Sequence, residues 1–122
     1  MSARGLVHGP LGRECWHLCI DMQRLFGAGT PWGIPWIEKI LPAVRSFSPD
    51  LILISAGFDA HHRDPLAEIG LQAEDFAWAT AELMEIADKS AGGRVVSLLE
   101  GGYDLKGLAA SAAAHIRQLM AA

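Results

Sequence analysis

Short apolar runs and longer stretches with helical periodicity alternate along this chain. The runs are WHLCI at 16–20, LILIS at 51–55 and RVVSLL at 94–99. Continuous apolar runs of this length are typical of strands that are buried in a parallel sheet. The pattern therefore predicts three such strands.

Three helices are predicted between and after these strands. The first spans about 35–47, where Pro35 suits the first turn and Pro42 is expected to kink or break the helix. The second spans 72–90 and ends before a glycine pair, and the third follows Asp104 as its N-cap. The second helix is expected to bury Phe76, Ala77, Thr80, Leu83, Met84 and Ala87. The third is expected to bury Leu105, Leu108, Ala112, Ile116 and Leu119.

This alternation predicts an α/β fold: three-layer, a short parallel sheet of about three strands with helices packed on it. In open parallel sheets, ligand sites gather beyond the carboxyl ends of the strands. Asp21, Asp59 and Tyr103 each follow one of the predicted strands. We therefore expect Asp59 and Tyr103 to be neighbours if their strands are adjacent.

Composition and charge narrow the classes of function. The chain is 51% hydrophobic and 20% charged, which indicates a globular domain. Its net charge of −4, with no basic stripe, argues against a nucleic-acid partner. No apolar run is long enough to span a membrane, and the N-terminus has no signal-peptide core. Cys15 and Cys19 lack C-x-x-C spacing and suit reduced thiols, so a soluble cytoplasmic protein is expected.

Two loops contain residues that could carry chemistry. In SAGFDAHHRDPLA, Asp59 is either a loop-capping carboxylate or a metal ligand, with His61 and His62 beside it. Zinc needs at least three protein ligands, and this tight spacing strains a tetrahedral site, so local spacing favours the cap. In LEGGYDL, Tyr103 either packs on the surface of a turn or donates to a developing oxyanion.

The two motifs together carry a family resemblance. SAGFDAHHRDPLAEIGL and GRVVSLLEGGYDLKGLAASAAAHI resemble the C-terminal portion of the histone deacetylase and acetylpolyamine amidohydrolase superfamily, from about Leu41 to Met120. The resemblance implies a fragment of a larger α/β deacetylase fold that acts on acetylated lysine or polyamine. It also implies that Asp59 ligates the catalytic zinc and that Tyr103 polarises the amide carbonyl.

The resemblance implies roles for other residues too. The Gly101-Gly102 pair shapes the turn that presents the tyrosine, and Pro65 and Leu66 line the substrate channel. The family also uses an upstream His-His pair as acid and base and a separate D-x-H with two more zinc ligands. Both motifs lie upstream of the zinc aspartate in the family and have no counterpart before Asp59 here, and His61 and His62 match no family ligand, so we expect no deacetylation by this chain alone. The exposed edges of a short sheet make a homo-oligomer possible.

The first third of the chain carries a second resemblance. HLCIDMQRLFGAGTPWGIPWIEKILPAV resembles the N-terminus of isochorismatase-like cysteine hydrolases, which implies a catalytic base at Asp21, with Gln23 beside it. A helix cap is the alternative role for Asp21. The predicted division is 1–44 and 45–122, a fusion of two gene fragments. The alternatives to a deacetylase fragment are a cysteine hydrolase fragment and a non-catalytic α/β domain.

Overall fold

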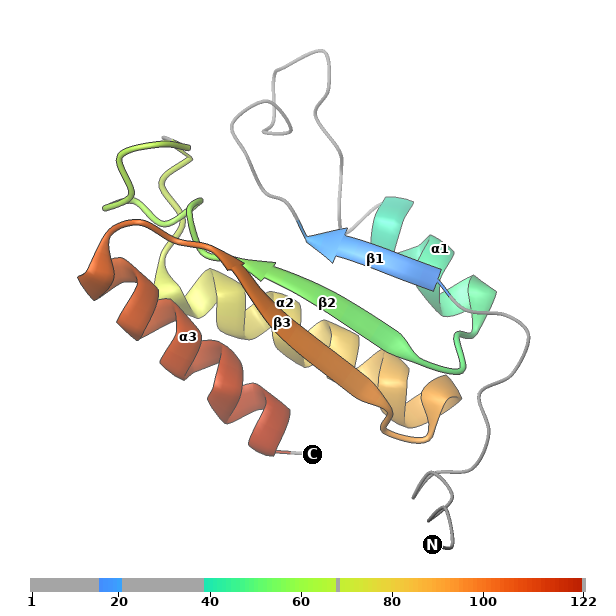
Figure 1. Ribbon diagram of the computed structural model, residues 1–122. Helices are drawn as coiled ribbons and strands as arrows, with labels where there is room; N and C mark the ends of the chain where they lie inside the picture. Colours follow the sequence, from blue (N-terminus) through green and yellow to red (C-terminus); the bar gives the residue numbers. More distant parts are fainter. Residues whose placement is uncertain (1–15, 21–38, 68, 122) are drawn as a thin grey trace, which may run out of the picture.

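The computed structural model describes residues 16–20, 39–67 and 69–121. Three parallel strands form one sheet in the order β1-β2-β3 (Figure 1). Their bounds are β1 Trp16–Ile20, β2 Ile52–Gly57 and β3 Val95–Gly101. The predicted strands are confirmed, with shifts of only one or two residues at their ends.

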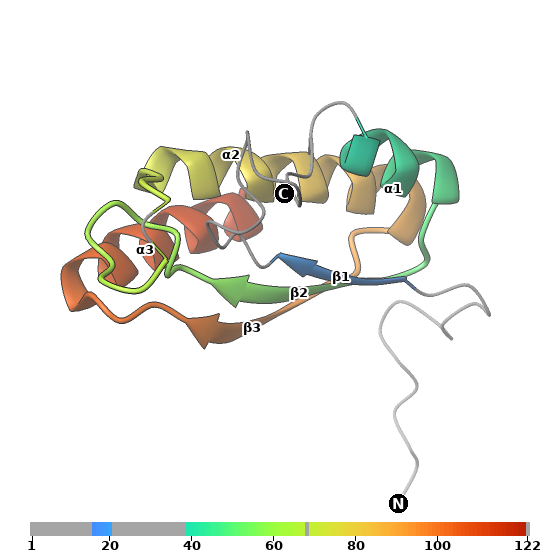
Figure 2. The same ribbon diagram turned by 90° about the horizontal axis from the view of Figure 1, so that it is seen from above.

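Three α-helices accompany the sheet. They are α1 Leu41–Phe47, α2 Ala73–Ile86 and α3 Leu105–Met120, and a π-helical turn, η3 Ala87–Ala91, extends α2. All of them lie on the same face of the sheet (Figure 2). The predicted α/β class and the parallel sheet are confirmed. The described residues make two layers, and the expected third layer has no counterpart among them.

Helix α1 begins close to Pro42. Pro42 falls in the first turn of α1 rather than in its interior, and the described residues just before the helix, 39–40, are π-helical. Proline is tolerated there because a first-turn N–H has no intrahelical partner to lose. The predicted start of this helix at Pro35 lies outside the described residues.

Helix α2 follows the prediction closely. Gln72 and Asp75 form a reciprocal capping box at its start. Five of the six residues expected inside are buried and Ala77 is half-buried; the five are Phe76, Thr80, Leu83, Met84 and Ala87. The segment ends at Gly92, which has a φ of 58°. Glycine adopts this left-handed conformation without a Cβ clash, as the sequence predicted.

The buried face of α3 differs from the prediction. Leu105 and Ile116, which were expected inside, are exposed. Leu108 and Ala112 are half-buried against the core. The fully buried positions are Gly107, Ser111 and His115, spaced i, i+4 and i+8. The helix is therefore rotated toward a face of small and polar residues.

Hydrogen bonds satisfy His115 on this face of α3, whereas the buried Ser111 hydroxyl has no partner among the described residues. The Thr80 hydroxyl donates to the Phe76 carbonyl at 2.6 Å, so it can accept from His115 Nδ1 at 2.7 Å. His115 Nε2 then accepts from the Ser97 hydroxyl at 2.8 Å. A neutral imidazole satisfies both contacts, and burial lowers the pKa of His115. His115 thereby joins α3 to α2 and β3.

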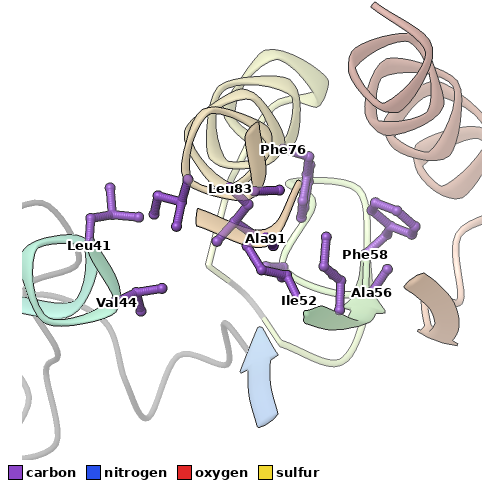
Figure 3. Packing of buried hydrophobic residues seen from close by; sticks show 12 residues of the cluster. Leu41, Val44, Ile52, Ala56, Phe58, Phe76, Leu83 and Ala91 are labelled. Atoms are coloured by element: carbon purple, nitrogen blue, oxygen red, sulfur yellow. The ribbon is translucent and has the colours of Figure 1, made fainter. Parts of the chain in front are cut away.

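The hydrophobic core lies between the sheet and the helices (Figure 3). Phe58, just after β2, packs edge-on against Phe76 of α2, with ring centroids 5.3 Å apart. The buried cluster consists of Leu41, Val44, Ile52, Ile54, Ala56, Phe58, Ala60, Phe76, Leu83, Ile86, Ala87 and Ala91. Within the described residues, no helix combines the length and apolar character needed to cross a bilayer.

Candidate functional site

The loops after β2 and β3 meet at the carboxyl edge of the sheet. The Phe58 N–H donates to the Gly101 carbonyl at 2.8 Å. The Asp59 carboxyl lies so close to Gly101 that a Cβ built there would be 3.5 Å from Asp59 Cγ. β2 and β3 are adjacent, so Asp59 lies beside the segment that carries Tyr103. The strand adjacency on which the expected neighbourhood depended is confirmed.

Gly102 gives the tyrosine-bearing turn its shape. Its φ of 133° is one that L-residues with side chains rarely adopt. A Cβ at Gly102 would also lie 3.0 Å from Leu108 Cδ1 and 3.2 Å from Phe58 Cβ. Glycine is therefore required both by the backbone conformation and by the close approach of α3. The turn leaves the Tyr103 side chain 60% exposed.

Asp64 ties the two loops together, and the sequence reasoning missed it. Its Oδ2 accepts from the backbone N–H of Tyr103 at 2.6 Å and of Asp104 at 3.3 Å. Its Oδ1 accepts from the Leu66 N–H at 3.0 Å. The residue is only 6% exposed. An Asp-Pro pair is a known turn signal, but it does not reveal a partner some forty residues away.

Asp104 caps α3 as predicted. Its Oδ1 accepts from the Gly107 N–H at 2.7 Å and from Arg63 Nε at 3.0 Å. The hydrogen bond from Gly107, followed by the contact with Arg63, lowers the pKa of Asp104. The Asp104 carboxylate therefore stays ionised, and its negative charge interacts favourably with the positive end of the helix dipole at the N-terminus of α3.

His61 has a packing role. It is buried, its Nδ1 accepts from the Arg63 N–H at 3.2 Å, and burial lowers its pKa. A Cβ at Gly107 would lie 2.7 Å from His61 Nδ1, so the ring seats α3 against the loop. His62, Pro65 and Leu66 are exposed on the same loop.

The described residues do not make a zinc site by themselves. Catalytic zinc takes three protein ligands. Among the residues that the structure describes, no group of three or more His, Cys, Asp or Glu side chains could hold a metal ion. Asp59 is a single half-buried carboxylate. Asp21 and Gln23, singled out from the sequence, lie outside the described residues.

Comparison with known families decides the ancestry. A family model described as Histone deacetylase domain matches residues 34–119. The chain belongs to the histone deacetylase domain family. The family match includes both the loop of Asp59 and the turn of Tyr103, so the resemblance stated for the C-terminal part is confirmed.

Relatives within the histone deacetylase domain family are longer than this chain. Histone deacetylase 10, chloroplastic, of Oryza sativa subsp. japonica is 45% identical over 83 residues, which cover 68% of this chain and 19% of the relative. A "Probable deacetylase" of Methanothermobacter thermautotrophicus is 46% identical over 86 residues, covering 69% and 24%. The crystal structure of the HDA15 HD domain superposes with a TM-score of 0.64 at 37% identity, covering 70% and 23%. The chain thus spans less than a quarter of each.

Proposed function

We propose that this chain supplies the aspartate and tyrosine of a zinc-dependent deacetylase site that hydrolyses acetylated lysine or acetylated polyamine. The observation that carries the proposal is the approach of the Asp59 carboxyl to Gly101, two residues before Tyr103. It supports a shared site because the two groups come from adjacent parallel strands and end at the same edge. Family membership supplies the reaction class.

Each residue has a chemical role in this proposal. The exposed Tyr103 hydroxyl donates a hydrogen bond to the amide carbonyl oxygen and stabilises the oxyanion that develops on it. Asp59 is one zinc ligand, and because the described residues hold no set of three, the ligand set must be completed from outside them. Gly101 and Gly102 let the backbone pass close to Asp59 and Leu108. Pro65 and Leu66 form part of the substrate channel wall.

The proposal includes a requirement for further groups. The only adjacent histidine pair in the chain is His61 and His62, and the His61 ring is buried beneath α3. A general base must reach the proton that it abstracts; the buried His61 ring does not, so this pair, of which only His62 is exposed, does not replace the two histidines of the family. We therefore expect the 122-residue chain alone to give no turnover with a fluorogenic acetyl-lysine substrate and added zinc.

A chimera tests the proposed roles directly. Residues 41–120 replace the aligned segment of the Methanothermobacter relative, once that parent protein has been shown to be active in the same assay. We expect the chimera to retain activity, Tyr103→Phe to lower kcat by about 10²- to 10³-fold, and Asp59→Ala to abolish both activity and zinc binding. Asp88→Asn, an exposed aspartate beyond α2, is the matched control and leaves activity unchanged. An active chimera that tolerates both site substitutions refutes the proposal.

The role of Asp21 as a catalytic base stays a prediction, as do the division at 44/45 and the cytoplasmic location. Asp21 lies outside the described residues, and no observation on them favours a cysteine hydrolase.

A further inference from the structure

The tyrosine-bearing turn has a backbone that needs an external support. Gly102 precedes Tyr103 and takes a φ of 133°, a region open to glycine with little steric cost. A glycine pair at this point leaves the chain free to adopt many other conformations. The direction in which Tyr103 leaves the turn is therefore set by what the backbone N–H groups after Gly102 contact.

Asp64 provides that contact from the neighbouring loop. Its carboxylate is buried and faces the N–H groups of Tyr103 and Asp104, at 2.6 and 3.3 Å, and that of Leu66 at 3.0 Å. An ionised carboxylate is an acceptor on both oxygens, so it suits three donors with no competing hydrogen. An asparagine of the same shape would lose acceptor sites and bring an NH₂ group toward these N–H donors.

A second contact closes the same link. Arg63, the residue before Asp64, donates to the Asp104 carboxylate at 3.0 Å. Two consecutive residues of the loop after β2 thus hold the segment 103–104. Asp64 binds the backbone of this segment, and Arg63 binds the Asp104 side chain. The Arg63 contact is exposed and contributes little by itself, whereas Asp64 is only 6% exposed and its hydrogen bonds are part-buried.

We propose that Asp64 is a positioning residue for Tyr103: its carboxylate fixes the backbone at Tyr103 and Asp104 so that the phenol leaves the turn in one direction. The effect of Asp64 on catalysis rests on the proposed function, in which Tyr103 acts on the substrate. The link itself exists whether or not the site turns over, and it can be measured separately.

The full chain offers a direct measurement, because Tyr103 is its only tyrosine. Labelling with 15N-tyrosine gives a single backbone amide signal. With 13Cγ-aspartate added, we expect a scalar coupling across the hydrogen bond from the Tyr103 nitrogen to one aspartate carboxyl carbon. This test needs no substitution, so it does not depend on a variant that folds. A protein without that coupling, whose Tyr103 amide exchanges as fast as in an unfolded peptide, overturns the proposal.

Substitution identifies the aspartate. In Asp64→Asn we expect the coupling to disappear, the amide proton to move upfield and amide protection at Tyr103 to fall by about tenfold or more. Asp88→Asn keeps all three, and Arg63→Gln changes them only slightly. A coupling that survives Asp64→Asn assigns the acceptor to another residue and overturns the proposal.

Kinetics in the chimera separates positioning from a general structural role. Asp64→Asn should lower kcat at least tenfold with KM nearly unchanged, and should have little further effect once Tyr103→Phe is present. Equal effects in both backgrounds contradict positioning. An inactive parent chimera would count against the proposed function alone, while the amide measurements would still decide whether Asp64 holds Tyr103.

Discussion

Strand β3 presents two contrasting sides. Toward the helices it places Ser97, whose hydroxyl lies 2.8 Å from His115 Nε2. On the opposite side it places Val96 and Leu98, which are 45% and 64% exposed. Successive strand residues point to opposite faces, so Ser97 points inward, on the same face as the partly buried Val95, while Val96 and Leu98 point toward solvent.

The difference shows that the described helices cover only one face of the sheet. On the helix side, every polar atom of the Ser97, His115 and Thr80 chain has a partner, and a continuous apolar cluster fills the rest. On the other side, Leu53 and Val96 pair in register and no described helix covers them. Apolar side chains on both faces are typical of strands that are buried in parallel sheets. The open face therefore has the composition of a surface that another layer covers.

The same substitution on the two faces gives the largest contrast. Leu83 is 1% exposed in the core, and Leu83→Ala should lower the free energy of unfolding by about 2–5 kcal/mol, because it removes buried contacts and leaves a cavity. Leu98→Ala on the open face should change it by about 0.5 kcal/mol or less. Urea denaturation followed by tryptophan fluorescence measures both. Comparable losses at the two positions would show that the open face is also covered in solution.

The polar bridge on the helix side predicts a pH dependence. Burial lowers the pKa of His115 below its ordinary value of about 6.5. Just below pH 6.5 the imidazole is therefore protonated in the unfolded chain but still neutral in the folded chain. Stability is then fully present above pH about 6.5 and is lost as the pH falls below it, by up to about 1.4 kcal/mol per pH unit.

Denaturation between pH 8 and 5 measures this loss, and His115→Gln isolates it. His61 also has a lowered pKa, so both proteins should keep a residual slope of the same sign. The wild-type protein should be the steeper of the two. Identical slopes would show that the titration of His115 does not contribute to the pH dependence of the free energy of unfolding.

Local pattern explains what the sequence could predict. The strands, the inner face of α2 and the cap at Asp104 depend on neighbours within one or two turns, and their periodicity or turn chemistry reveals them. The placement of Asp59 beside the Tyr103 turn was expected only if the two strands are adjacent, and the observed strand order meets that condition.

Distant partners explain what the sequence could not predict. His115 is buried on α3 because Ser97 and Thr80, 18 and 35 residues away, satisfy its two ring nitrogens. By hydrophobicity alone Ile116 is the better inward residue, yet it is exposed. Asp64 accepts from groups 39 and 40 residues away. Neither contact leaves a local signal in the sequence.

The open face also predicts association, as the exposed sheet edge did in the sequence. If two copies cover each other's apolar surface, burial of one leucine side chain contributes about 1.5–3 kcal/mol. Leu98→Glu should then raise the dissociation constant of the self-associated form at least about tenfold, which sedimentation velocity across a concentration series measures. Leu105→Glu is the matched control, since Leu105 is also exposed but lies in the first turn of α3, where a carboxylate is favourable. Equal weakening by both would assign the effect to net charge. No association of the wild-type protein at any concentration would contradict this prediction.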